Sequence, residues 1–136
     1  MAITGRCYCG ELQYEAEGAP RFKGQCHCRE CQYISGGGAN FFMIMPSEGF
    51  RYTKGTPKAF RRSDIPNPAT REFCANCGTH ILTRSPMDTS MVVLKVGTMD
   101  DPKQYGGPQG AIWMDDKQPF HLVAEGVITF PKFPGR

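Results

Sequence analysis

The sequence lacks any long hydrophobic run. No stretch of its 136 residues approaches the roughly 20 consecutive apolar residues that a helix needs to cross a bilayer. The first residues, Met1 to Arg6, contain no apolar core of signal-peptide length. These absences argue against a membrane protein and predict a cytoplasmic location.

Charge of one sign is also scarce. The chain has 16 basic and 13 acidic residues, a net charge of +3, and neither a run of like charges nor an alternation of basic and aromatic residues. A nucleic-acid or membrane surface is therefore not predicted, whereas the small positive excess would suit a small anionic ligand. The length and the 40% hydrophobic content predict a single domain over residues 1–136.

Helical patterns are few, and short apolar runs separated by glycine and proline are typical of a mainly β domain. The expected strands are residues 12–16, 22–25, 40–45, 50–53, 58–62, 71–73, 80–83, 91–96, 111–114 and 121–123. The runs 41–45 and 91–96 are almost continuously apolar, so we expect them to be covered on both faces and to form the core. One short helix is expected to begin at or just after Cys28 and to end at the glycines 36–38.

Cysteine, by contrast, is plentiful. The chain has seven cysteines, an odd number that cannot pair completely into disulfides. In a reducing compartment such thiols stay free unless a metal or a reaction uses them. Seven in 136 residues also falls below the density of small disulfide-rich scaffolds. Metal binding is therefore the better explanation of these residues.

Four of the cysteines form two short motifs. Cys7 and Cys9 are one pair, Cys74 and Cys77 are the other, and glycine follows each pair directly. Each motif presents two thiolates across a tight turn, which is the form of a zinc knuckle. We therefore predict one closed site in which these four residues hold a structural zinc ion and tie the start of the chain to its middle.

The remaining three cysteines, Cys26, Cys28 and Cys31, lie at the start of the expected helix. Cys28 and Cys31 share a helix face, and the partial positive charge of the helix N-terminus favours thiolates there. Three ligands leave one position on a zinc ion open, which is typical of a catalytic site. We expect this second zinc to be partly occupied in a purified sample, because three ligands hold it less firmly than four.

Two alternatives stay open for the metal centres. His27, His80 or His121 could supply a fourth ligand to a zinc ion, which would close the second site and argue against catalysis. An iron-sulfur cluster is the other alternative, because cysteine spacing alone does not choose the metal.

The segments that carry a family resemblance are residues 5–10, 26–31 with Ser35 and Gly36, 73–79, 97–102 and 118–121. In this order they resemble the glutathione-dependent formaldehyde-activating enzymes (the GFA family), which also includes centromere protein V. The resemblance implies a β-tent zinc-binding fold in one GFA-like domain, with the structural and the catalytic zinc on the two cysteine sets given above. It also implies a carbon-sulfur lyase activity that joins glutathione to formaldehyde as S-hydroxymethylglutathione.

A zinc ion that carries three thiolates has much of its charge neutralised, so it should suit a thiol ligand better than it acidifies water. We expect a small thiol such as glutathione to ionise there and to attack a small aldehyde such as formaldehyde. His27 is a candidate proton donor to the forming alkoxide. Arg29 is a candidate partner of a glutathione carboxylate. Lys54, the Arg61-Arg62 pair and Arg71 could serve the same purpose, although a solvated strand face is the preferred interpretation of these residues.

A different class of function is a non-catalytic binding module that zinc only stabilises. Such a module needs closed metal sites alone, whereas this sequence keeps a three-cysteine set with no obvious fourth ligand. The enzyme is therefore the favoured hypothesis, with no nucleic acid or membrane as a partner.

Overall fold

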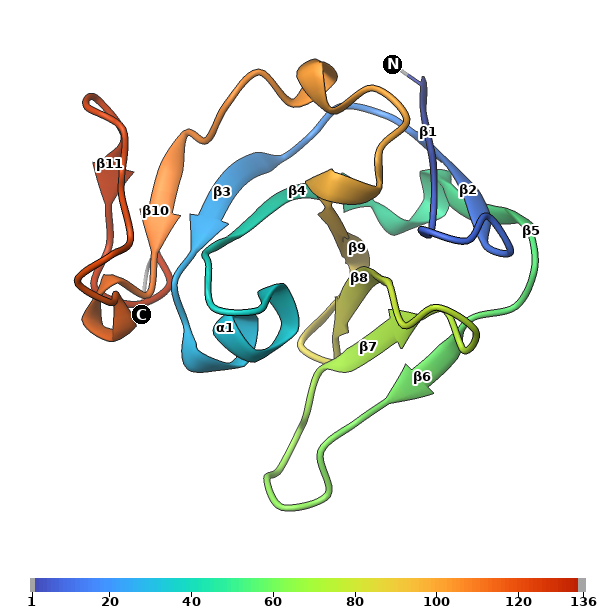
Figure 1. Ribbon diagram of the computed structural model, residues 1–136, viewed down its shortest axis with the longest axis horizontal. Coiled ribbons are helices and arrows are strands. Elements are labelled where there is room, and N and C mark those ends of the chain that lie inside the picture. Colours follow the sequence, from blue (N-terminus) through green and yellow to red (C-terminus); the bar gives the residue numbers. More distant parts are fainter. Residues whose placement is uncertain (1, 135–136) are drawn as a thin grey trace.

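The computed structural model describes residues 2–134, which form two β-sheets and one α-helix. The smaller sheet is antiparallel and has the order β1-β2-β5. Its strands are β1 (Ala2–Arg6), β2 (Gln13–Glu17) and β5 (Phe50–Lys54). In Figure 1 this sheet stands beside the edge of a larger, curved sheet.

The larger sheet has eight strands in the order β11-β10-β3-β4-β9-β8-β7-β6. These strands are β11 (Ile128–Thr129), β10 (Gly110–Ile112), β3 (Phe22–Cys26), β4 (Asn40–Pro46), β9 (Asp88–Lys95), β8 (His80–Ser85), β7 (Thr70–Phe73) and β6 (Lys58–Phe60). Neighbours are antiparallel, except that β10 runs parallel to both β3 and β11. Four short 3-10 turns join them: η1 (Ser47–Gly49), η2 (Val96–Thr98), η3 (Pro102–Tyr105) and η4 (Met114–Asp116).

The α-helix α1 (Arg29–Ser35) has the boundaries that the sequence predicts. The sulfur of Cys28 accepts a hydrogen bond from the backbone N–H of Cys31 at 3.3 Å and so caps the first turn. Gly36 ends the helix in the left-handed conformation, at φ 80°, and donates its N–H to the carbonyl of Gln32. Figure 1 places α1 between the β3–β4 and β7–β8 regions of the sheet.

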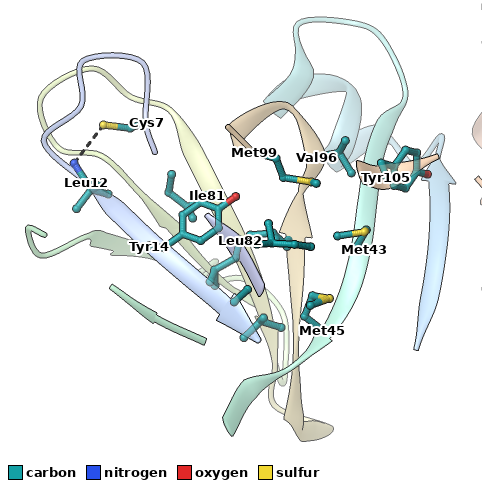
Figure 2. Packing of buried hydrophobic residues seen from close by; sticks show 14 of the residues in the cluster. Cys7, Leu12, Tyr14, Met43, Met45, Ile81, Leu82, Val96, Met99 and Tyr105 are labelled. Carbon is teal, nitrogen blue, oxygen red and sulfur yellow. Dashed lines mark hydrogen bonds between the residues drawn. The ribbon is translucent and has the colours of Figure 1, made fainter. Parts of the chain in front are cut away.

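The two central strands, β4 and β9, are covered on both faces, as their apolar sequences predict. Met43 and Leu94 lie in the core between the two sheets, together with Tyr14 of β2. Figure 2 shows the side chains of Tyr14 and Met43 on opposite sides of that space. Phe42 and Ile44 point the opposite way, into a second core that contains cysteines of α1 and β3. The mainly β prediction with one short helix is confirmed for the described residues.

Several strand predictions were wrong in detail. Residues 121–123 form no strand, because the ring of His121 is drawn into a buried hydrogen-bond network instead. The strand expected over 111–114 ends at Ile112, since Trp113 adopts φ 56° and begins a turn. Strands β1 and β11 were not predicted at all. Among the described residues no helix is long and apolar enough to span a membrane.

Candidate metal centres

Four cysteines meet where the loop after β1 approaches the turn between β7 and β8. The sulfurs of Cys7, Cys9, Cys74 and Cys77 all lie within 4.8 Å of one another. The sulfur of Cys9 is 3.6 Å from that of Cys7 and 3.7 Å from that of Cys74. Four thiolates around a tetrahedral zinc ion, at a zinc–sulfur distance of about 2.3 Å, would be about 3.8 Å apart. The predicted set is thus assembled, and its spacing fits a zinc ion.

Backbone N–H groups support the sulfurs of this cluster. Leu12 donates its N–H to the sulfur of Cys7 at 3.3 Å, the dashed line in Figure 2, and Cys77 donates its N–H to that of Cys74 at 3.5 Å. Gly78 closes the second turn at φ 79°, where a residue with a side chain would be strained. Such donors favour the ionised thiolates that a metal requires.

The Thr79 hydroxyl connects the two halves of the four-cysteine cluster. It accepts a hydrogen bond from the N–H of Tyr8 at 3.0 Å and lies 3.2 Å from the sulfur of Cys77. The Thr79 hydroxyl, together with the backbone N–H groups of Thr79 and Cys9, lowers the pKa of the Cys77 thiol. This favours the ionised form that a metal ion requires.

The second cluster brings Cys26, Cys28 and Cys31 within 4.8 Å of one another. Cys26 ends β3, Cys28 caps α1, and Cys31 lies one turn further along the helix. The thiols of Cys26 and Cys31 donate hydrogen bonds to the sulfur of Cys28. These bonds lower the pKa of Cys28, and the bond from Cys26 raises the pKa of Cys26. Cys26 and Cys31 are each only 6% exposed, so the cluster is largely shielded from water.

No histidine joins either cluster among the described residues, nor does any acidic side chain within the same distance. The alternative with His27, His80 or His121 as a fourth ligand is therefore not what the structure shows. The second cluster therefore offers three cysteine sulfurs to a metal ion, and its open position stays a prediction.

His27 projects from the opposite side of the backbone to Cys26, and its ring is fully buried. Its Nδ1 lies 3.0 Å from Nδ1 of His121, and its Nε2 lies 3.1 Å from the side-chain nitrogen of Gln25. His121 Nδ1 also accepts the N–H of Gln118 at 3.1 Å, so His27 Nδ1 must be the donor of the pair. Both ring nitrogens of His27 are thus engaged away from the sulfurs.

Two cationic side chains share the sheet face that carries the three-cysteine cluster. Cross-strand partners lie on one face, and the relevant pairs are Asn40 with Cys26, Lys95 with Phe42, and Arg71 with Thr83. Together with α1 they enclose a cavity of about 120 Å³, here called the small cavity. It is lined by Cys26, Cys31, Asn40, Phe42, Ile44, Arg71, Thr83, Met91, Val93, Lys95, Ile112 and Phe133.

A larger hollow of about 430 Å³, here called the helix groove, runs along the exposed side of α1. It is lined by Arg29, Glu30, Tyr33, Ile34, Phe60, Arg62, Arg71 and His80. Arg71 therefore borders both hollows, and its guanidinium is 3.2 Å from a carboxylate oxygen of Glu30. Nδ1 of His80 is buried and has no hydrogen-bond partner among residues 2–134.

The predicted Arg29 is exposed at the rim of the helix groove. Its guanidinium lies over the ring of Tyr33, 5.1 Å from the centroid, and donates to the side-chain oxygen of Gln32. Arg71, expected on a solvated strand face, is mostly buried instead, with 14% of its side chain exposed. Lys95 was missed, although a lone charge at the end of an apolar strand was a visible signal.

The fold and the two clusters define a class: a mainly β protein with two separate cysteine sites that could each hold a metal ion. The sequence profile of the family described as glutathione-dependent formaldehyde-activating enzyme matches residues 2–116. The chain belongs to this family, which supports a function connected with glutathione and formaldehyde.

Comparison with solved structures finds a similar fold in the crystal structure of a Rhodobacter sphaeroides protein. That protein is 17% identical, with a TM-score of 0.61, and the match covers 77% of this chain and 96% of the other. At this identity the likeness shows the fold alone. No curated protein matches the chain.

Proposed function

We propose that this protein is a zinc-dependent enzyme of the carbon-sulfur lyase type, which joins a small thiol such as glutathione to a small aldehyde such as formaldehyde. The observation that carries the proposal is the three-cysteine cluster, which gathers no fourth ligand among the described residues and borders a cavity. A metal held only for stability would gain from a fourth protein ligand, as the other cluster has.

In this proposal Cys7, Cys9, Cys74 and Cys77 hold a structural zinc ion, and Cys26, Cys28 and Cys31 hold the catalytic one. A bound zinc ion supplies an electron-pair acceptor that favours the ionised form of a substrate thiol. The chemistry of the donors fits, because thiolate-only sites select zinc among the common divalent ions. The seven unpaired cysteines also favour a reducing compartment, so we place the enzyme in the cytoplasm.

The thiol substrate is proposed to lie in the helix groove, which has the volume that a tripeptide-sized ligand requires. Arg29 at its rim, Arg62 within it and Arg71 at its inner end provide cations for carboxylates such as those of glutathione. The unpartnered Nδ1 of His80 provides a further polar contact in the same groove. Glu30 lines the same hollow and pairs with Arg62 and Arg71, and Asp64 pairs with Arg62, so a substrate carboxylate would compete with these acidic side chains for the two arginines.

His27 stays a prediction as the proton donor. Its ring would first have to leave the hydrogen bonds to His121 and Gln25 that hold it on the other side of β3. Solvent at the open end of the helix groove is a simpler source of that proton.

Metal analysis together with a thiol titration tests the proposal. The purified chain should contain close to two zinc ions, with the second one below full occupancy. After replacement of zinc by cobalt, glutathione should change the visible absorption of the cobalt at the three-cysteine cluster. Cys28→Ser should abolish that change, whereas the exposed control Lys103→Met should retain it. If glutathione leaves the cobalt spectrum unchanged, the enzyme proposal fails and a zinc-stabilised binding module takes its place.

A further inference from the structure

The small cavity contains one charged group without a partner. The side chain of Lys95 is on the strand β9, and the residue is only 8% exposed. Its ammonium makes no hydrogen bond or ion pair with another residue in the range 2–134. The Lys95 nitrogen keeps some contact with water, since His80 Nδ1 is the one fully buried side-chain nitrogen or oxygen without a partner among residues 2–134. An ammonium that is held by water alone can donate its hydrogen bonds to an anion that enters beside it.

Part of the negative charge beside Lys95 comes from the three-cysteine cluster itself. Three thiolates around a divalent ion leave one net negative charge, and the sulfurs of Cys26 and Cys31 border the same cavity as Lys95. A substrate thiolate would add a second negative charge, which would move to the carbonyl oxygen when the carbon–sulfur bond forms. Arg71, the other cation of the cavity, already pairs with Glu30 and lies 3.4 Å from the hydroxyl of Thr83. Lys95 is thus the uncommitted cation.

The small cavity suits a small substrate. At about 120 Å³ it has less than a third of the volume of the helix groove. It therefore suits an aldehyde of one or two carbons better than a thiol of glutathione size. Phe42, Val93 and Ile112 form apolar walls, which lower the local dielectric and strengthen a hydrogen bond from Lys95.

We propose that the small cavity is the aldehyde site and that Lys95 is the catalytic residue that binds the carbonyl oxygen and stabilises the alkoxide that forms from it. This inference rests on the proposed function. It adds the size class of the aldehyde and the group that stabilises the negative charge on the carbonyl oxygen, which the proposed function leaves open.

The reaction balances with the groups named. The thiol loses its proton to solvent, and a lone pair of its sulfur forms the new carbon–sulfur bond at the carbonyl carbon. The π pair of the C=O bond moves to oxygen, where the Lys95 ammonium donates a hydrogen bond to the alkoxide. The alkoxide then takes a proton from Lys95, which regains one from solvent. The product is the neutral hydroxymethyl thioether.

The test compares Lys95→Met, which removes the charge at similar volume, with Lys95→Arg and with Lys103→Met as an exposed control. Exchange between ¹³C-formaldehyde and its glutathione adduct, measured by NMR, gives the rate above the spontaneous reaction. Lys95→Met should lower kcat by about 10²- to 10³-fold, the usual effect of losing an oxyanion donor. Lys95→Arg should recover part of the rate, and KM for glutathione should stay within about twofold.

Two further measurements separate this role from a purely structural one. Binding of ¹³C-formate, a one-carbon anion, should be detectable by NMR in the zinc-loaded protein and lost in Lys95→Met. Val93→Ala enlarges the cavity and should raise the rate with propionaldehyde relative to formaldehyde. If Lys95→Met retains full activity and formate binding, the inference is overturned while the proposed function stands. If the unmodified protein does not accelerate the condensation, the proposed function itself fails.

Discussion

Loss of Cys9 should destabilise the protein more than loss of a cysteine of the three-cysteine cluster. Cys9 is exposed, and its sulfur contacts Cys7 and Cys74, so Cys9→Ser removes a metal ligand without leaving a cavity in the core. Cys9 and Cys74 are 65 positions apart. A cross-link of that span removes unfolded-chain entropy equivalent to about 4 kcal/mol at 25 °C. For a chain of 136 residues this corresponds to a fall in Tm of about 15 °C.

Cys28→Ser is the matched control. Serine caps a helix at least as well as the cysteine that it replaces. The cluster of Cys26, Cys28 and Cys31 closes only a short loop, from the end of β3 to the first turn of α1. Its chain-entropy contribution is about half as large, so the fall in Tm should be less than half that of Cys9→Ser. Scanning calorimetry gives Tm, and atomic emission gives the zinc content. If Cys9→Ser loses one zinc ion but melts within about 5 °C of the unmodified protein, the four-cysteine site does not stabilise the fold as argued.

Three further predictions concern buried groups. Gly5→Ala would place a Cβ 2.3 Å from the ring of Tyr14 and 2.4 Å from the carbonyl oxygen of Thr98, so the urea midpoint should report a loss of about 3 kcal/mol. Burial raises the pKa of Tyr14 to about 12. Since folding favours its neutral form, this stabilisation is complete below about pH 10, and about 2.7 kcal/mol is lost as the pH rises to about 12. Urea titrations across that range should show the loss, and Tyr14→Phe should reduce it but not abolish it, because burial also raises the pKa values of Tyr52 and Tyr105. His121→Ala leaves Nδ1 of His27 unpaired and should lower the free energy of unfolding by about 1 to 3 kcal/mol. In the unmodified protein, ¹⁵N NMR should show the ring proton of His27 on Nδ1. A proton on Nε2 instead would contradict the assigned hydrogen bonds.

The central part of the fold was predictable because its hydrophobic pattern and its helix-end residues indicate the same structure. The apolar run 41–45 allows only a buried strand, and Cys28 and Gly36 mark both ends of the helix. Strand β1 was missed because Ile3 is its only large apolar residue. Its position is fixed by pairing with β2, which is a tertiary interaction rather than a local preference.

The cysteine clusters were predictable from spacing, since a tight turn or one helix turn brings each local pair together. The residues around the second cluster were not, because sheet register decides which of them share its face. Arg71 and Lys95 are 24 positions apart and reach the same cavity only through the order β9-β8-β7. Without that order, a basic residue on a strand is more often a solvated one, which is how Arg71 was interpreted.

The alternation of side chains in β3 explains how one short segment serves two purposes. Cys26 points to the face that carries the helix and the small cavity, whereas Gln25 and His27 point to the other face and bond to the segment around His121. Buried hydrogen bonds of Gln25 and His27 therefore hold β3 in place on the face opposite to the Cys26 sulfur. A metal ion bound by the three-cysteine cluster would depend on three local sulfurs and not on a link between distant parts of the chain. In the proposed reaction it could thus exchange a ligand without loosening the fold, which a metal ion in the four-cysteine cluster could not do.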